Sequence, residues 1–321
     1  MSNPGRCLIT GMSGFTGVYL ERELRDAGYQ VFGLASALSI TAAGAVAGGS
    51  GFSAEAAAAA SARTLPAHII TADLTDLDAV RRAVLQVRPD VVIHLAAIAF
   101  VAHGDVETMY RTNVVGTRNL LQALAEGDHT PRVVLLASSA NIYGNTESDA
   151  IVEDTPPMPE NDYAVSKLAM EYMARLWQGD LPITVARPFN YTGVGQSVNF
   201  LIPKIVDHFR SGAREIELGN LDVARDFSDV RAVVAAYRGL VDRPVPGQVF
   251  NICSGRAHSP GDVINMLEQI AGYEISVKVN PAFVRANEVK HLRGSNARLL
   301  AAVGELPAIS LADTLEWMYR A

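Results

Sequence analysis

The stretch GMSGFTG, Gly11-Met-Ser-Gly14-Phe-Thr-Gly17, decides the fold of this chain. It follows the apolar run Cys7–Thr10 and precedes residues with helical spacing, Val18–Ala27. Glycines at this spacing permit a tight turn and let the backbone approach a ligand closely. The helix that follows offers free N–H groups and a partial positive charge. A strand, this turn and a helix in that order predict a site for the pyrophosphate of a dinucleotide.

Strand and helix patterns alternate from this turn to about residue 190. Strands alternating with helices of about 10 to 20 residues indicate right-handed βαβ units and a parallel sheet. Two strands, VVIHLAA (91–97) and VVLLAS (133–138), are apolar at nearly every position, which is typical of a sheet covered on both faces. The pattern predicts an α/β fold with a Rossmann-type doubly wound parallel sheet. The other predicted elements are strands Gln30–Leu34, His68–Thr71 and Ile183–Ala186, and helices Asp76–Val87, Val106–Glu126 and Tyr163–Gln178.

The regular alternation fades past Asn190 and returns only for a helix, Asp229–Leu240, and a strand, Gln248–Cys253. It fades again from Gly255 to the end. This pattern predicts a second, smaller α/β domain that is discontinuous in sequence. The predicted boundaries are residues 1–190 plus about 222–255 for the dinucleotide-binding domain, and about 191–221 plus 256–321 for the substrate-binding domain.

Composition narrows the classes of protein that remain. The 321 residues carry a net charge of −7, which argues against a nucleic-acid partner. The two cysteines, Cys7 and Cys253, stand alone in apolar runs and suggest neither a disulfide nor a metal site, so a reducing cytoplasm is expected. The Ala- and Gly-rich segment 37–63 lacks the large apolar residues of a membrane span and is expected to be a surface insertion.

Tyr163 and Lys167 form the candidate catalytic pair, within Tyr163-Ala-Val-Ser-Lys167. On a helix, residues four apart lie on one face, one turn from each other. A free tyrosine has a pKa near 10, and an adjacent ammonium favours the phenolate, so the pair could exchange a proton near neutral pH. The strand that ends in Ser138-Ser139 lies upstream of this helix. Together with the dinucleotide turn, the pair predicts an enzyme that transfers a hydride.

Six motifs occur in the order GMSGFTG, HLAA, NVVGT, SSANIYG, YAVSK and ARPFN. In this order they resemble the extended short-chain dehydrogenase/reductases of the epimerase/dehydratase type, which act on nucleotide sugars, over essentially the whole chain. The resemblance implies that Ser139 polarises the substrate carbonyl and that Tyr163 is the acid/base. It also implies that Lys167 tunes Tyr163 and that Asn113 helps to orient the lysine, often through water.

The end of the second predicted strand bears on the choice of cofactor. An acidic residue there would bond the ribose of NAD and repel the 2′-phosphate of NADP. Ala35-Ser36 stands there instead, which favours NADP(H) and leaves NAD(H) open. The residues predicted to contact the cofactor are Gly11, Ser13, Gly14, Phe15, Thr16, Gly17, Ser36, Asp73, Leu74, Leu95, Ala96, Ala97, Tyr163 and Lys167.

Two later segments, LGNLDVARDF (218–227) and RANEVKHLRGSNARL (285–299), resemble the GDP-mannose branch of this family, and most of all its GDP-4-keto-6-deoxy-D-mannose reductases. The resemblance implies that Arg225 binds pyrophosphate and that Arg285 and Glu288 contact the nucleoside. The planar guanidinium of Arg225 suits phosphate oxygens. The other predicted substrate contacts are Ser139, Asn190, Asn199 and Lys204.

One position separates two activities within this branch. Its 4,6-dehydratases use a glutamate two residues before the tyrosine of the xYG motif, where this chain has Asn141. An amide cannot act as the proton-transfer base that elimination needs. The expected activity is therefore NAD(P)H-dependent reduction of the 4-keto group of GDP-4-keto-6-deoxy-D-mannose to GDP-6-deoxymannose, with GDP-D-rhamnose as the expected product. The alternatives are a nucleotide-sugar 4-epimerase with tightly bound NAD, the disfavoured GDP-mannose 4,6-dehydratase, and a non-catalytic cofactor-binding regulator.

The predicted helix Tyr163–Gln178 is apolar on two faces, and the predicted helix Val106–Glu126 is similarly two-sided. One face can pack on the sheet, and the other favours a homodimer built through these helices. The alternative is that the C-terminal domain covers the second face. The two faces consist of Val165, Leu168, Tyr172 and Leu176, and of Met170, Met173 and Trp177.

Overall fold

The computed structural model describes residues 4–36, 68–99, 105–146, 150–283 and 289–321. The predicted insertion 37–63 lies outside the described residues. The chain forms two compact units, and the domain boundaries predicted from the sequence stay a prediction, because they separate binding roles and not compact bodies. Unit 1 comprises residues 1–138, 165–186 and 237–249, and unit 2 comprises residues 139–164, 187–236 and 250–321.

A seven-stranded sheet is built from β1 (Arg6–Thr10), β2 (Gln30–Ala35), β3 (Ile69–Thr71), β4 (Val91–His94), β5 (Val133–Ala137), β6 (Ile183–Pro188) and β10 (Val249–Ile252). Its strand order is β10-β6-β5-β4-β1-β2-β3, and β1 pairs in parallel with both β2 and β4. The register sets Thr10 beside Leu34 on one side and beside His94 on the other. Doubly wound sheets bind ligands where the strand order reverses, at the carboxyl ends of the strands. The predicted Rossmann-type sheet is confirmed, although the strand predicted for residues 91–97 ends at His94.

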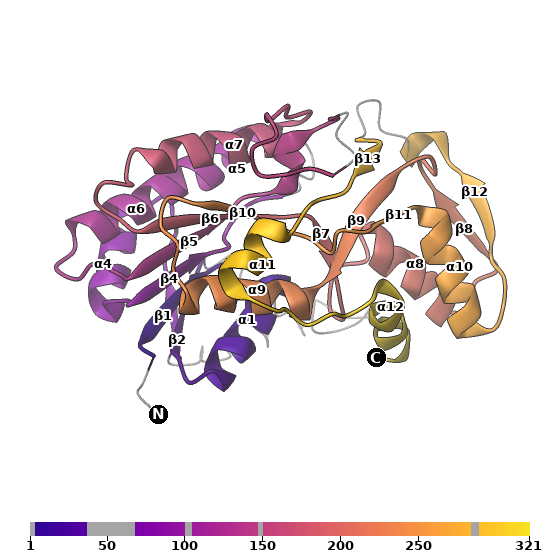
Figure 1. Cartoon of the computed structure of the whole chain (residues 1–321), viewed down its shortest axis with the longest axis horizontal. Helices are drawn as coiled ribbons and strands as arrows, with labels where there is room; N and C mark the ends of the chain where they lie inside the picture. Colours follow the sequence, from indigo (N-terminus) through magenta and orange to yellow (C-terminus); the bar gives the residue numbers. More distant parts are fainter. Residues whose placement is uncertain (1–3, 37–67, 100–104, 147–149, 284–288) are drawn as a thin grey trace, which may run out of the picture. The chain divides into compact units, whose positions relative to one another are not determined.

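Helices cover both faces of this sheet (Figure 1). On one face lie α4 (Leu77–Val87), α6 (Thr117–Glu126) and α7 (Asp162–Arg175), and on the other lie α1 (Phe15–Asp26) and α9 (Val230–Asp242). Leu120 of α6 and Met170 of α7 are fully buried against strand residues such as Val92 and Val134. Burial on both faces explains why the inner strands are apolar at nearly every position.

The helix predicted over Val106–Glu126 is three segments, which corrects that prediction. α5 (Val106–Tyr110) passes into a π-helical stretch, η2 (Arg111–Gly116), and then into α6. The hydroxyl of Thr117 donates a 2.7 Å hydrogen bond to the carbonyl of Asn113, four residues earlier, while the Thr117 N–H bonds the carbonyl of Val114. A side chain that takes a helical carbonyl in this way competes with the regular backbone ladder.

Unit 2 has small sheets and helices of its own. β9 (Ala224–Asp229) pairs with β7 (Asn190–Thr192), β11 (Ala257–His258) and β13 (His291–Leu292), while β8 (Glu215–Leu218) pairs with β12 (Ser276–Val279). Its core lies between the helices α8 (Leu201–Arg210), α10 (Pro260–Ala271) and α12 (Leu311–Arg320). Its short elements are η3 (Ala140–Tyr143), η4 (Pro281–Phe283) and α11 (Ala297–Val303).

Helices and strands continue beyond Gly255, although the alternation of patterns in the sequence fades there. Both long helices there begin with a capping box, in which a serine and an aspartate three residues later bond each other's backbone N–H. The serines are Ser259 and Ser310. These boxes are the local signal for α10 and α12, which the sequence analysis missed along with α8 and α11. Across the described part of the chain, the helices are too short or too polar for any to span a bilayer.

Candidate active site

The glycine turn between β1 and α1 has the shape expected of a pyrophosphate cradle. Gly11 has a φ of +72°, a left-handed conformation that favours glycine, and a Cβ there would lie 2.8 Å from the backbone nitrogen of Ala96. A Cβ on Gly17 would lie 2.4 Å from the carbonyl oxygen of Met12. Side chains are thus excluded at both positions by backbone atoms, which cannot move aside cheaply.

The start of α1 can receive an anion. Gly14 is its N-cap and has no side chain that could occupy the space before the helix. The start of a helix carries a partial positive charge, and its N–H groups can bind phosphate. The turn therefore fits a dinucleotide pyrophosphate. Ser13, Phe15 and Thr16, the remaining predicted contacts in this stretch, are half-buried beside it.

The other predicted cofactor contacts surround the carboxyl ends of β1, β2, β3 and β4. Leu95 and Ala96 follow β4 and hold the end of β1, because the N–H of Leu95 bonds the Thr10 carbonyl at 3.2 Å and that of Ala96 bonds the Thr10 hydroxyl at 3.2 Å. Ser36 follows β2. Asp73 is exposed after β3, and its carboxylate accepts bonds from the N–H and hydroxyl of Thr75. The other two positions are Leu74, which is buried, and Ala97, which is half-buried.

Tyr163 and Lys167 lie one turn apart on α7, as their spacing predicted. The ammonium of Lys167 is almost completely buried and donates a 2.7 Å bond to the carbonyl of Ala137 at the end of β5. Burial lowers the pKa of Lys167 to about 8, while the nearby carboxylate of Glu171 opposes that shift. The lysine can therefore lose or regain a proton near neutral pH.

Ser139 and Tyr163 are joined by a hydrogen bond between their side chains. Ser139 is buried at the start of η3, and its hydroxyl also accepts the N–H of Asn141 at 3.2 Å. Burial, and to a smaller extent Tyr191, raises the pKa of Tyr163 to about 12, and the hydrogen bond from Ser139 only partly offsets this rise. This corrects the expectation of a lowered tyrosine pKa, because desolvation outweighs the stabilisation of the phenolate. Tyr163 is thus a proton donor at rest.

Asn113 is buried within η2 and bonds the catalytic helix directly. Its amide nitrogen donates to the hydroxyl of Ser166 and to the carbonyl of Ile98, both at 3.0 Å. Its amide oxygen accepts the N–H of Ile98 at 2.8 Å. Ser166 is the residue next to Lys167. The predicted orienting role therefore has a direct protein contact that the sequence did not indicate.

In unit 2, β9 carries Arg225 into a group of paired strands. Arg225 pairs with His258 of β11 and with Leu292 of β13, while β7 places Asn190 opposite Phe227 of the same strand. Both Arg225 and Asn190 are half-buried. These two predicted substrate residues thus lie on adjacent strands of one sheet.

Asp226, beside Arg225, holds this group of strands together. Its fully buried carboxylate accepts bonds from the N–H and hydroxyl of Ser254 at 2.8 and 2.6 Å, from Gly255 at 2.9 Å and from Gly294 at 3.3 Å. Burial raises the pKa of Asp226, and these hydrogen bonds oppose the rise. The sequence analysis missed Asp226, whose only local signal is its place next to a candidate phosphate-binding arginine.

The remaining predicted substrate contacts are less uniform. Lys204 of α8 donates a 2.7 Å bond to the Glu217 carbonyl and lies 4.4 Å from the ring centre of Phe283, so its ammonium is engaged by β8 and η4. Asn199 is exposed just before α8. Arg285 and Glu288 lie outside the described residues. The substrate roles of all four stay predictions.

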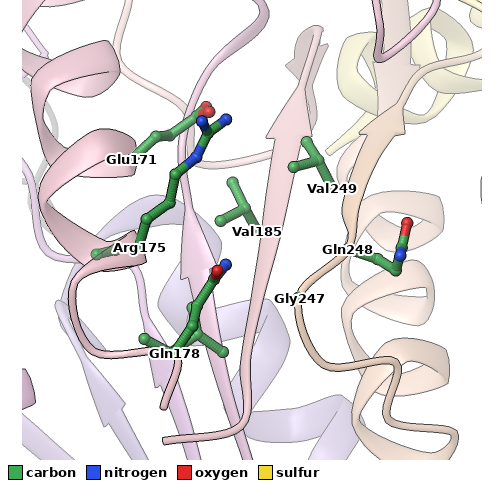
Figure 2. A pocket seen from close by; sticks show the side chains of 9 residues that line it. Glu171, Arg175, Gln178, Val185, Gly247, Gln248 and Val249 are labelled. Carbon is green, nitrogen blue, oxygen red and sulfur yellow. The ribbon is translucent and has the colours of Figure 1, made fainter. Parts of the chain in front are cut away.

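A separate cavity of about 280 Å³ lies in unit 1 between α7, β6 and the residues before β10. Figure 2 shows Arg175 extending along α7 toward Glu171, with Gln178 below it and Gln248 on the right, on the segment before β10. The predicted cofactor and substrate residues do not line it. One of its lining residues, Glu171, lies one helical turn from Lys167 and raises the pKa of that lysine.

Comparison with known proteins agrees with this geometry. The family model described as GDP-mannose 4,6 dehydratase matches residues 8–318. The chain belongs to this family. A GDP-6-deoxy-D-talose 4-dehydrogenase from Aggregatibacter actinomycetemcomitans is 33% identical, covering 98% of this chain and 97% of its own. A GDP-6-deoxy-D-mannose reductase from Pseudomonas aeruginosa is 38% identical over 71% of this chain and 78% of its own.

Two solved structures share the fold of this family member along its whole length. A candidate epimerase from Burkholderia cenocepacia is 50% identical, with a TM-score of 0.85 and coverage of 98% of this chain and 97% of that one. RMD from Pseudomonas aeruginosa, complexed with NADPH, is 31% identical, with a TM-score of 0.79 and 98% of both chains covered. The chain is accordingly an NAD(P)-dependent enzyme of the extended short-chain dehydrogenase/reductase type, as its motifs predicted.

Proposed function

We propose that this family member reduces the 4-keto group of GDP-4-keto-6-deoxy-D-mannose with NAD(P)H. The observation that carries the proposal is the hydrogen bond between Ser139 and Tyr163, on the helix that also bears Lys167. A ketone reduction needs a hydride and a proton, and this constellation supplies the proton. When bound at the glycine turn, the dinucleotide would supply the hydride.

The residues would act in the following way. Ser139 donates a hydrogen bond to the C4 carbonyl oxygen and polarises it, and Tyr163 donates its proton to that oxygen as negative charge develops. Its raised pKa, about 12, means that Tyr163 carries its proton before the reaction at neutral pH. The buried ammonium of Lys167 then stabilises the negative charge of the tyrosinate that remains.

Elimination chemistry, which the family's description names, is a poorer fit. Asn141 stands in η3, two residues after Ser139, and its backbone makes the turn that ends at Gly144. Its side-chain amide cannot take a proton from C5. We therefore propose reduction and not dehydration, although both reactions would use the same cofactor turn and the same tyrosine.

The cofactor and the product stereochemistry follow from separate observations. Ser36 and the buried Ala35 at the end of β2 put no carboxylate against a 2′-phosphate, and the RMD structure holds NADPH, so NADPH is proposed over NADH. GDP-D-rhamnose is proposed as the product, in line with the reductase relative. The talose dehydrogenase relative, which covers nearly the whole chain, makes the C4 epimer the second candidate.

The test is to incubate the purified chain with GDP-4-keto-6-deoxy-D-mannose and NADPH or NADH while following nicotinamide absorbance. Oxidation of NADPH, with a product whose C4 configuration is read by NMR coupling constants, supports the proposal and selects the epimer. Tyr163→Phe is expected to lower kcat by about a hundredfold or more, since proton donation contributes that much. Unchanged absorbance with the wild-type chain would overturn the reductase proposal. Interconversion of sugars without net oxidation would favour the epimerase.

A further inference from the structure

A continuous chain of buried hydrogen bonds crosses unit 1 from the glycine turn to the catalytic helix. The hydroxyl of Thr10 lies 2.7 Å from His94 Nδ1, and His94 Nε2 lies 2.8 Å from the hydroxyl of Thr117. Thr117 donates to the Asn113 carbonyl at 2.7 Å, and the Asn113 side chain donates to Ser166 at 3.0 Å. All five side chains are at most 1% exposed.

The acceptors of this chain fix where every proton lies. The Asn113 carbonyl can only accept, so the Thr117 hydroxyl points its proton there and must accept from His94 Nε2–H. His94 Nδ1 is then the bare nitrogen and accepts the Thr10 hydroxyl, which in turn accepts the N–H of Ala96 at 3.2 Å. The imidazole is neutral in a single tautomer. A second proton on His94, at Nδ1, would exclude donation by the Thr10 hydroxyl.

The surroundings of His94 also favour its neutral form. His94 lies on β4, and the charged group that acts on it is the ammonium of Lys167 from α7. Burial, and to a smaller extent the ammonium of Lys167, lowers the pKa of His94 to about 3. The chain of bonds is therefore insensitive to pH across the neutral range.

One end of this series of hydrogen bonds lies at the glycine turn, and the other lies on α7. Thr10 precedes Gly11 and, through Ala96, holds the segment against which Gly11 packs. Ser166 stands between Tyr163 and Lys167 in sequence on α7. The π-helical segment η2 lies between these two ends. Its Asn113 carbonyl accepts the hydrogen bond of the Thr117 hydroxyl.

Apolar side chains at these positions would avoid the free energy that is needed to bury polar groups. The rest of β4 is apolar, and five buried polar side chains are tolerated only when their hydrogen bonds are satisfied. Such networks define one arrangement of the elements they join. This chain of bonds defines the position of the helical turn that holds Lys167.

We propose that His94 and Thr117 are positioning residues of the active site, which act through Asn113 and Ser166 on the turn of α7 that carries Lys167. The inference rests on the proposed function for its kinetic consequence, but its structural consequence can be measured without any sugar. If one of these hydrogen bonds is removed, α7 is held less firmly through Ser166, and the bond from Lys167 to the Ala137 carbonyl weakens.

The test uses matched variants. Thr117→Val keeps the shape but removes the hydroxyl, and Thr117→Ser keeps the hydroxyl. Thr184→Val is the control, because Thr184 is fully buried in the same unit and donates to the Val245 carbonyl at 3.1 Å, outside this chain of bonds. Should Thr117→Val not fold, Thr117→Ala removes the same hydroxyl.

Two readouts are needed. The chain has only four lysines, Lys167, Lys204, Lys278 and Lys290, so carbon-13 NMR of labelled lysine resolves the titration of Lys167, assigned by its loss in Lys167→Met. Thr117→Val is expected to lower the pKa of Lys167 by about half a unit, since a bond that favours the ammonium weakens. It is also expected to lower kcat about tenfold or more and to change the KM for NADPH less than about threefold, as a misplaced group does.

Restoration of both readouts in Thr117→Ser, with neither affected in Thr184→Val, would support the proposal. It is overturned if Thr117→Val behaves as Thr184→Val does, or if Thr117→Ser is no better than Thr117→Val. Should the wild-type chain not reduce the keto sugar, the proposed function fails on its own. The Lys167 titration of the same variants then still decides this inference.

Discussion

At the scale of single residues, the ionisation of Lys167 sets the predicted pH dependence. Its pKa of about 8 lies below the ordinary value for lysine, so the ammonium that we propose to stabilise the tyrosinate is lost as the pH rises through about 8. We expect kcat for the keto sugar to fall above that pH and to be restored on return to neutral. The measurement is a pH profile of kcat at saturating NADPH.

A variant of Glu171 tests whether Lys167 causes the fall in kcat at alkaline pH. Its carboxylate raises the pKa of Lys167, so Glu171→Gln should move the fall in kcat to lower pH. Glu126→Gln, on the exposed surface of α6, should leave the profile in place. An unchanged profile in Glu171→Gln would mean that another group controls the alkaline fall.

At the scale of elements, the packing of α1 on its turn predicts a sharp effect of one methyl group. Gly17→Ala would place a Cβ 2.5 Å from the Cα of Met12, and the turn would have to open. We expect a loss of about 1–3 kcal/mol in the free energy of unfolding, as for other overpacked sites, together with weaker NADPH binding. Urea unfolding and NADPH fluorescence titration measure the two effects.

Gly179→Ala is the matched control for this prediction. A Cβ there would meet nothing within 4 Å, so its effect on the free energy of unfolding should stay within about 0.5 kcal/mol. NADPH affinity equal in the two variants would contradict the close-approach argument for Gly17.

At the scale of the whole molecule, the exposed face of α7 predicts self-association. Met170 and its neighbours pack in the core of unit 1, but Tyr172 and Val165 are exposed, and Leu176, in the turn directly after α7, is 80% exposed. Val115 is also exposed on η2, which α7 contacts through Ser166. The expected homodimer would bury these apolar side chains, consistent with the two-sided helix seen in the sequence.

Leu176→Glu should weaken such a dimer by about a hundredfold, because an unpaired carboxylate would be buried in the interface. Leu85→Glu is the control, since Leu85 is similarly exposed but lies on α4. Light scattering coupled to size exclusion, over a range of concentrations, measures both. A wild-type chain that is monomeric at every concentration would remove the prediction.

Much of this protein could be predicted from local patterns alone. The turn Gly11–Gly17, the alternation of strands and helices and the spacing of Tyr163 and Lys167 are all short-range features, and they led to the sheet, the cofactor turn and the catalytic helix. The family resemblance added Ser139 and Arg225. Short-range patterns are sufficient here because turn geometry and helical periodicity depend only on residues close in sequence.

The tertiary structure decided what depends on burial and on contacts between distant residues. It gave Tyr163 a raised pKa and Lys167 a lowered one, since desolvation is a property of the packed core. It also joined Thr10, His94 and Thr117 into one chain of bonds, and it brought Asp226 to Ser254 and Gly294. The sequence thus determined the kind of chemistry, and the packed fold decided the protonation states and the anchoring of the residues proposed to perform it.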